Sequence, residues 1–152
     1  MRKKTLTPIR RRAAPPAPRT AGNLPGHEVI LDVIFEEGLL FLAVRNLGVA
    51  PAVNVSMKFD RAIHGVNGSK EVSALSLFRH IAFLAPQKEI RTFLDTSASY
   101  FSRNEPTRFS VAINYEDLLG RAAAYSLTHD LEIYREIGYV RREGPQRGRR
   151  TP

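Results

Sequence analysis

Apolar and polar residues alternate with a period close to two through most of the chain after His27. Val29, Leu31, Val33 and Phe35 occupy one face of the first such segment. Glu37 and Gly38 then supply a short turn, and residues 39–46 return as a second strand. A short connection that contains glycine joins antiparallel neighbours, so residues 29–46 predict a β-hairpin.

The same period predicts strands over 53–59, 90–95 and 109–115. The last of these is the clearest, with a turn at 116–120 and a return strand over 122–134. We expect the return strand to place every second residue on one side, and the strand 109–115 is a candidate for a sheet edge. The alternating residues of the return strand are Tyr125, Leu127, His129, Leu131 and Ile133.

Three segments lack a regular pattern. Residues 61–73 predict a loop, because Gly65 and Gly68 interrupt them, and residues 75–84 are apolar enough for a strand or a short helix. Residues 96–106 are polar and predict a loop. Seven or so short strands with frequent turns and no long helix favour an immunoglobulin-like antiparallel β-sandwich over residues 27–138.

Two aromatic residues in these irregular segments, Phe78 and Tyr100, have two possible roles. They can close the open ends of a sandwich, which is the commoner arrangement and the one that we expect. If they instead emerge together with His80, they would form a surface for a partner.

Three segments of the predicted sandwich carry a recognisable motif: residues 44–55, which read VRNLGVAPAVNV, then Leu84-Ala85-Pro86, and residues 115–120. Together they resemble bacterial immunoglobulin-like modules of the CARDB type. Gln87 stands where such modules usually have glycine. The resemblance implies an envelope or surface protein with protein or carbohydrate contacts. The motif residues have structural reasons: we expect a positive φ at Gly48, an end to strand pairing at Pro51, and a close approach of backbones at Ala52.

Charge is distributed unevenly along the 152 residues, which carry a net charge of +8. Residues 27–139 contain 11 basic and 14 acidic side chains. The positive excess therefore belongs to residues 1–26, with seven basic side chains and no acid, and to 140–152, with five against one. Their basic residues are Arg2, Lys3, Lys4, Arg10, Arg11, Arg12, Arg19, Arg141, Arg142, Arg147, Arg149 and Arg150.

Both ends are rich in proline or glycine and poor in large apolar residues, so we expect residues 1–26 and 139–152 to be disordered basic tails. Three roles fit such tails: solvated ends, contact with the phosphates of a nucleic acid, or attachment to an anionic lipid surface. The longest apolar run is far shorter than a membrane span, and no apolar segment follows the basic start, so we expect neither a transmembrane segment nor a secretory signal. A cytoplasmic location is favoured, with envelope association as the alternative.

Candidate chemistry is sparse. The chain has no cysteine, and its four histidines lack metal-ligand spacing. Residues 65–70 lack the spacing of a phosphate-binding loop, no serine stands in a G-x-S-x-G motif, and the acidic pair Glu116-Asp117 suits turn capping. We therefore predict no catalytic residue, no metal site and no cofactor.

The sequence favours a non-enzymatic interaction or structural module. Its sandwich would bind another protein through a sheet edge or through loops, and its basic tails would add electrostatic attachment. The alternative is a nucleic-acid-associated protein that binds phosphates through the tails.

Overall fold

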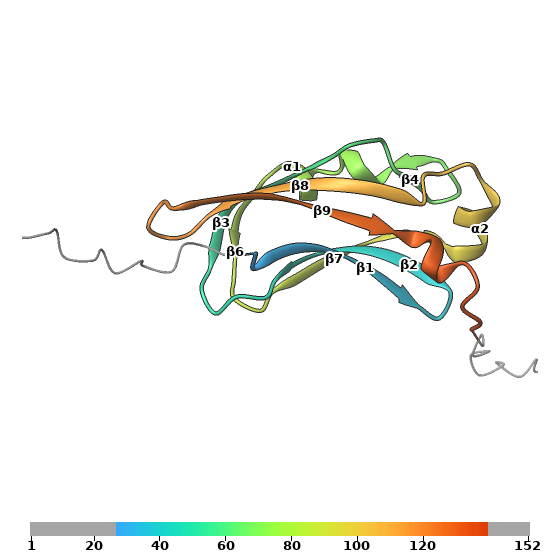
Figure 1. Ribbon diagram of the computed structural model, residues 1–152, viewed down its shortest axis with the longest axis horizontal. Coiled ribbons are helices and arrows are strands. Elements are labelled where there is room, and N and C mark those ends of the chain that lie inside the picture. Colours follow the sequence, from blue (N-terminus) through green and yellow to red (C-terminus); the bar gives the residue numbers. More distant parts are fainter. Residues whose placement is uncertain (1–26, 140–152) are drawn as a thin grey trace, which may run out of the picture.

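The computed structural model describes residues 27–139, which form two antiparallel sheets packed face to face (Figure 1). The strands of the first sheet lie in the order β1-β2-β7, and those of the second in the order β6-β3-β8-β9. The bounds in the first sheet are β1 Val29–Glu36, β2 Leu39–Asn46 and β7 Glu89–Thr96; in the second they are β6 Ile81–Leu84, β3 Ala52–Phe59, β8 Arg108–Glu116 and β9 Ala122–Asp130. The predicted immunoglobulin-like β-sandwich is confirmed.

The β1–β2 hairpin has the bounds that the pattern predicts. Glu36 pairs with Leu39 across a two-residue turn. Glu37 (φ 49°) and Gly38 (φ 79°) both lie in the left-handed region. A two-residue turn with two positive φ values matches the twist of the strands that it joins, which is why glycine is favoured there.

The segments between the strands are more regular than the sequence predicts. Residues 61–73 hold a small ribbon of β4 (His64–Gly65) and β5 (Lys70–Glu71), followed by the 3-10 helix η1 (Val72–Ala74). Residues 75–84 contain both expected alternatives, the short helix α1 (Ser76–Arg79) and then β6.

The prediction of a plain loop over 96–106 is wrong. Helix α2 (Ser97–Ser102) occupies its first half. The helix begins at Thr96, whose side chain accepts a hydrogen bond from the Ser99 N–H, and a threonine in this position is a common N-cap.

The core lies between the inner faces of the two sheets. Phe78 and Tyr100 are 1% exposed and belong to it, so they close the sandwich and do not form the alternative surface with His80, which is exposed. The Tyr100 hydroxyl donates to the Pro106 carbonyl at 2.6 Å, and burial raises its pKa.

Two other expectations are corrected. The strand 109–115 is not a sheet edge, because β8 lies between β3 and β9. Ile133 does not continue the alternation of β9 and is 67% exposed. The strand ends at Asp130, whose carboxylate accepts from the Glu132 N–H and begins the 3-10 helix η2 (Leu131–Tyr134).

The loop between β2 and β3 is held by side chains of the segment that resembles the CARDB type. Asn46 is buried, donates to the carbonyls of Ala50 and Leu84, and accepts from the Gly48 N–H. Gly48 does not have the predicted positive φ; a side chain there would crowd Asn46. Gln87 does have one (φ 59°), which is the conformation that glycine adopts most easily.

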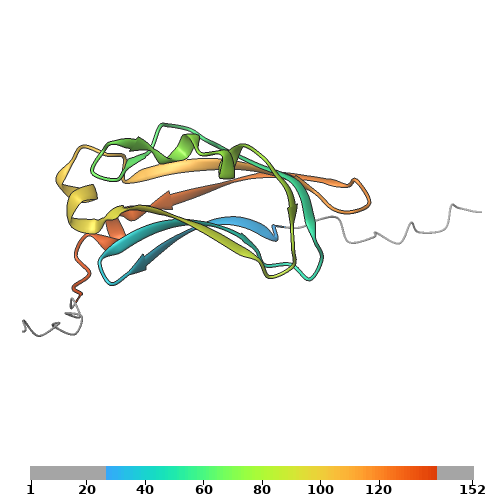
Figure 2. The same cartoon turned by 180° about the vertical axis from the view of Figure 1, so that it is seen from behind.

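The loops gather at the two ends of the sandwich. Figures 1 and 2 show the β2–β3 loop, the β8–β9 turn and the start of β1 at one end, with α2 and η2 at the other. The predicted boundary at residue 138 lies one residue before the end of the described chain. No helix within residues 27–139 has the length and apolar character needed to span a membrane.

Candidate interaction surfaces

The exposed strand edges are where this fold can accept another chain, since an edge strand presents N–H and C=O groups without a partner. Each sheet has two edges: β1 and β7 in the first, β6 and β9 in the second. The four edges differ in what covers them, and the edge that is left uncovered is the candidate binding site.

The β1 edge is covered by side chains from the end of the chain. The Leu47 N–H donates to the Glu28 carbonyl, so Glu28 and Leu47 form a hydrogen-bonded pair. Because bonded and non-bonded pairs alternate in an antiparallel ladder, the backbone groups of Val29, Leu31 and Val33 point away from β2. The Tyr125 hydroxyl donates to the Val29 carbonyl, and the Tyr134 hydroxyl donates to the Val33 carbonyl at 3.1 Å. Hydroxyl groups thereby occupy two of the outward carbonyls of β1.

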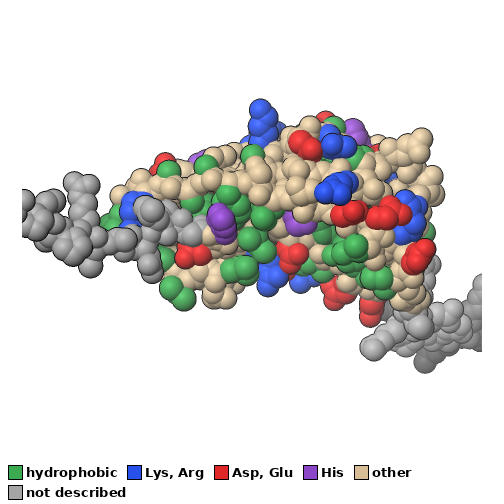
Figure 3. All heavy atoms as spheres, in the orientation of Figure 1, with side chains coloured by type: hydrophobic (Ala, Val, Ile, Leu, Met, Phe, Trp, Pro, Cys, Tyr) green, Lys and Arg blue, Asp and Glu red, His purple; other side chains and the backbone are tan. Residues whose placement is uncertain are grey.

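His129 lies between these two tyrosines in the chain and interacts with the backbone of Leu31. Its ring packs 5.5 Å from that of Phe109. Burial lowers the pKa of His129, while the Leu31 backbone and the Asp32 carboxylate act in the opposite direction. The ring Nε2 is buried without a hydrogen-bond partner. Figure 3 shows hydrophobic and histidine side chains along the middle of this face, where β9 overlies β1.

The β7 and β6 edges are restricted in other ways. Near its end β7 is covered by the β4–β5 ribbon, where the Val66 N–H donates to the Leu94 carbonyl at 2.8 Å. Its earlier half carries Arg91, which forms ion pairs with Glu36 at 3.1 Å and Glu89 at 2.9 Å. Charges of this kind discourage pairing with a further strand. The β6 strand offers four residues.

The β9 edge is open along nine residues. Arg121 and Leu131 direct their backbone groups toward the partner strand: the Arg121 carbonyl accepts from Asp117, and the Leu131 N–H donates to Thr107. Because hydrogen-bonded and non-bonded pairs alternate in an antiparallel ladder, the even-numbered residues of β9 point their backbone groups outward. No hydrogen bond within the described chain uses the outward groups of Ala122, Ala124, Ser126 and Thr128.

The side chains around this edge leave it accessible. Between Arg121 and Asp130 there is neither a charged residue nor a proline. The outward-facing side chains are small, and Thr128 meets Ser110 of β8 at 2.8 Å between hydroxyl oxygens. The arrangement can therefore hold an extended segment by backbone hydrogen bonds without a steric or charge barrier.

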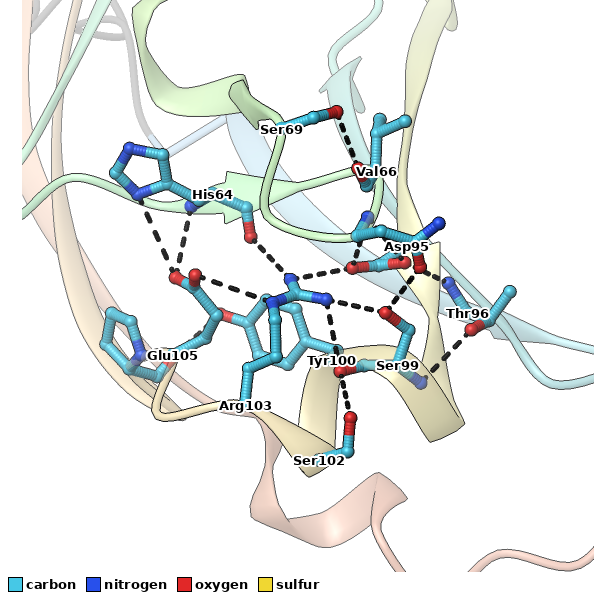
Figure 4. A network of polar contacts seen from close by, with 12 residues as sticks. His64, Val66, Ser69, Asp95, Thr96, Ser99, Tyr100, Ser102, Arg103 and Glu105 are labelled. Atoms are coloured by element: carbon cyan, nitrogen blue, oxygen red, sulfur yellow. Dashed lines mark hydrogen bonds and ion pairs between the residues drawn. The ribbon is translucent and has the colours of Figure 1, made fainter.

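A network of charged side chains at the far end of the sandwich is the most elaborate polar cluster in residues 27–139 (Figure 4). Asp95 is 1% exposed and accepts from the backbone N–H groups of Asn67 and Thr96. Arg103 lies beside it, with Nη2 2.7 Å from Asp95 Oδ2 and Nε 3.8 Å from Glu105 Oε1. Its Nη1 donates to the Ser99 carbonyl and hydroxyl.

This network fastens the β4–β5 ribbon to α2. The Glu105 carboxylate accepts from the His64 N–H, and Arg103 donates to the His64 carbonyl. The Ser99 hydroxyl donates to the Asn67 side-chain carbonyl at 2.7 Å. An amide oxygen is not a general base, so this hydrogen bond does not activate Ser99 as a nucleophile. The network thus positions two segments of backbone.

The alternation of residues 90–95 predicts that Asp95 lies on the solvent side, but its side chain is buried. A bulge between Leu40 and Phe41 shifts the β2–β7 register, so that Leu94 and Asp95 are both buried. The β9 edge was missed as a specific site because a single sequence does not order its strands.

The predicted site residues are the twelve basic side chains of the two tails, and all of them lie outside the described residues. Among the residues that the structure describes, no three histidine, aspartate or glutamate side chains are grouped so that they could hold a metal ion. His80 meets Asn54 at 3.3 Å. The predicted capping role of Asp117 is confirmed, since it accepts from the Leu119 and Arg121 N–H groups.

A family model described as a domain of unknown function, DUF8453, matches residues 17–135. This match covers well over half of the chain. The chain belongs to the DUF8453 family. The DUF8453 segment includes every strand of both sheets and ends directly after η2. Neither the curated proteins nor the solved structures include a match to the chain.

Proposed function

We propose that this DUF8453 chain is a non-enzymatic protein-interaction module that binds an extended segment of another protein along the β9 edge. The observation that carries the proposal is the row of outward backbone groups on β9, which nothing in residues 27–139 covers. An added strand would gain main-chain hydrogen bonds from four successive outward-facing residues.

The contrast with the other edges supports this choice. Tyrosine hydroxyls occupy the β1 edge, and an ion-paired arginine and a ribbon restrict β7. Open edges favour aggregation, so a sandwich that restricts β1 and β7, keeps β6 short and leaves nine residues of β9 open is consistent with use of β9 in binding. The resemblance to modules of the CARDB type agrees with a role in protein contacts.

The test uses proline, which removes a backbone N–H. Ser126→Pro removes an outward donor of β9 and leaves the β8–β9 hydrogen bonds in place. Arg91→Pro is the matched control on the β7 edge. The Asn46 N–H donates to the Lys88 carbonyl, and hydrogen-bonded pairs alternate along the strands, so the Arg91 N–H points away from β2. This substitution therefore also removes an outward N–H, but from a different edge.

The full chain and both variants are used to capture partners from a nuclease-treated lysate of the source organism, and the captured partner is then purified and titrated. We expect Ser126→Pro to weaken binding by about tenfold or more, since several hydrogen bonds to the added strand depend on the edge. Arg91→Pro should bind as the unmodified chain does. Equal binding by the unmodified chain and Ser126→Pro contradicts the proposal.

The second candidate function is attachment to nucleic acid through the basic tails, and it is favoured by the location of the positive charge. The described residues are net negative, whereas the tails hold twelve basic side chains against one acid. Titration of the full chain with a single-stranded RNA at two salt concentrations tests it, with a log–log slope of about −0.7 expected for each phosphate neutralised.

A further inference from the structure

A row of side chains on the outer face of the second sheet leads from a lysine to the open β9 edge. Lys58 of β3 pairs with Ala112 of β8, and Ala112 pairs with Ser126 of β9. Residues that pair directly across a sheet have their side chains on the same face. The three side chains therefore form one line across the sheet, and a strand added at β9 would place its own residue next in that line.

The line crosses an open hollow of about 190 Å³, which is shallow because two of its lining side chains, Ala112 and Ser126, are small. The Lys58 side chain is exposed, and it forms no ion pair or hydrogen bond with any residue that the structure describes. The hollow is lined by Lys58, Phe59, Asp60, Ser110, Ala112 and Ser126.

Asp60 is the only acid that lines this hollow, and its carboxylate already has partners. It accepts from the Ser110 N–H at 3.0 Å and forms an ion pair with Arg61 at 3.3 Å. Lys58 is thus a cation that borders the hollow without a counter-charge, and an acidic group entering from the β9 edge would supply one.

A second charge lies in the row that begins at Ala122, the first outward-facing residue of β9. Ala122 pairs with Glu116 of β8. The Glu116 carboxylate accepts from the Asn54 side-chain amide at 3.2 Å and has no cationic partner within residues 27–139. Because Ala122 and Ser126 are four residues apart on one strand, an added strand would meet the two charges with side chains that are also four residues apart.

The distances along the rows select the length of the partner side chain. Neighbouring strands lie about 4.8 Å apart, so the Cα atom opposite Ser126 would lie about 14 Å from that of Lys58. An extended lysine of about 6 Å, an extended glutamate of about 5 Å and an ion-pair contact of about 3 Å span this distance. Aspartate is one methylene shorter and does not reach. Glu116 is one strand closer to the edge, so a lysine or arginine opposite Ala122 reaches it easily.

We propose that the segment bound along β9 is an antiparallel strand with a glutamate opposite Ser126 and a basic residue opposite Ala122. Both sheets are antiparallel throughout, and antiparallel pairing is the more stable kind. Since the partner runs in the opposite direction, its motif is Glu-x-x-x-Lys or Glu-x-x-x-Arg. A second copy of β9 does not satisfy either charge, because no charged residue lies between Arg121 and Asp130.

This inference rests on the proposed function, binding along β9, and adds the chemistry of the segment that binds. Lys58 and Glu116 are specificity-determining residues, since they favour one order of charges and repel the reverse. The backbone of β9 supplies the hydrogen bonds that any extended segment would use.

The test is a fluorescence anisotropy titration of the full chain with labelled synthetic peptides at low ionic strength, where exposed ion pairs are least screened. The peptide TVEVTVKVT carries the motif, and TVKVTVEVT has the same composition with the two charges exchanged. We expect the first peptide to bind about tenfold more tightly than the second, because two weak attractions are replaced by two repulsions.

Variants of Lys58 then test the assigned contact. Lys58→Met should weaken binding of TVEVTVKVT about threefold and Lys58→Glu about tenfold. The peptide TVKVTVKVT should bind Lys58→Glu more tightly than it binds the unmodified chain. Lys70→Glu is the matched control, since it makes the same charge change on the exposed β5 strand and should leave all affinities unchanged. Thermal melts verify that the variants are folded.

Four results overturn the inference: no binding of TVEVTVKVT by the unmodified chain, equal affinity for the two isomeric peptides, unchanged binding by Lys58→Glu, or a dimer of the chain that Ser126→Pro dissociates. Ser126→Pro separates these failures from failure of the proposed function. If this variant loses the captured partner while Lys58→Glu keeps it, only the charge motif is wrong. If Ser126→Pro keeps the partner as well, binding along β9 is also wrong.

Discussion

Replacing Arg103 by methionine should destabilise the sandwich far more than the same change at an exposed arginine. Arg103 Nη2 lies 2.7 Å from a carboxylate oxygen of Asp95, which is 1% exposed. Without the guanidinium, Asp95 keeps two backbone N–H donors but no counter-charge in a site that excludes water. Removing one partner of a buried pair costs about 3 kcal/mol or more. For a domain of this size that corresponds to a fall in Tm of about 12 °C.

The assay is unfolding by heat and by urea at neutral pH, with Arg91→Met as the matched control. Arg91 forms two ion pairs at the surface, and its loss should cost less than about 1 kcal/mol. Asp95→Asn in the Arg103→Met background should cost less than in the unmodified chain, with a coupling of about 2 kcal/mol. A loss in Arg103→Met no greater than in Arg91→Met, or additive effects in the cycle, refutes the reasoning.

Three further changes have defined expectations. Gln87→Ala, which keeps the positive φ but loses two hydrogen bonds to the β2–β3 loop, should cost about 1–2 kcal/mol in urea unfolding, and Gln87→Gly should cost less because glycine relieves the strained φ. Gly65→Ala would drive a methyl group into the Leu94 carbonyl oxygen, so we expect increased proteolysis of the β4–β5 ribbon relative to the unmodified chain. Burial lowers the pKa of His129 in the folded chain below its usual value of 6.5. As the pH falls, the unfolded chain therefore binds the proton at a higher pH than the folded chain does, and the free energy of unfolding decreases as the pH drops below 6.5. His129→Gln should therefore show a smaller fall in Tm between about pH 7.5 and about pH 5.5, and an equal fall in both proteins would exclude the histidine as its source.

The hairpins were predictable because their sequences combine a regular alternation of apolar and polar residues with residues that favour a turn. The alternation from Val29 to Phe35 and the turn at Glu37 and Gly38 fix β1 and β2 to the residue. The final hairpin was equally clear as far as Asp130. Its end was overestimated because Ile133 happens to continue the apolar spacing after the strand has stopped.

The polar features were harder to predict because they depend on register and on strand order. The bulge opposite Leu40 buries Asp95, and nothing in the local pattern marks that shift. The helix after Thr96 did have a signal, a threonine suited to N-capping, in a segment otherwise typical of a loop. Which strand forms an edge follows from the pairing of β3 with β8, a contact between residues some sixty positions apart.

The tyrosine hydroxyls on β1 also limit how many chains can associate. An open fibre needs every copy to offer two complementary edges, one for each neighbour. In residues 27–139, hydroxyl groups hold two of the β1 carbonyls, charge and a ribbon restrict β7, and β6 is short. The proposed association at β9 would therefore close after one event. A second copy would give a two-fold dimer and a foreign segment a heterodimer, and the described sandwich would keep no equivalent edge for a third chain.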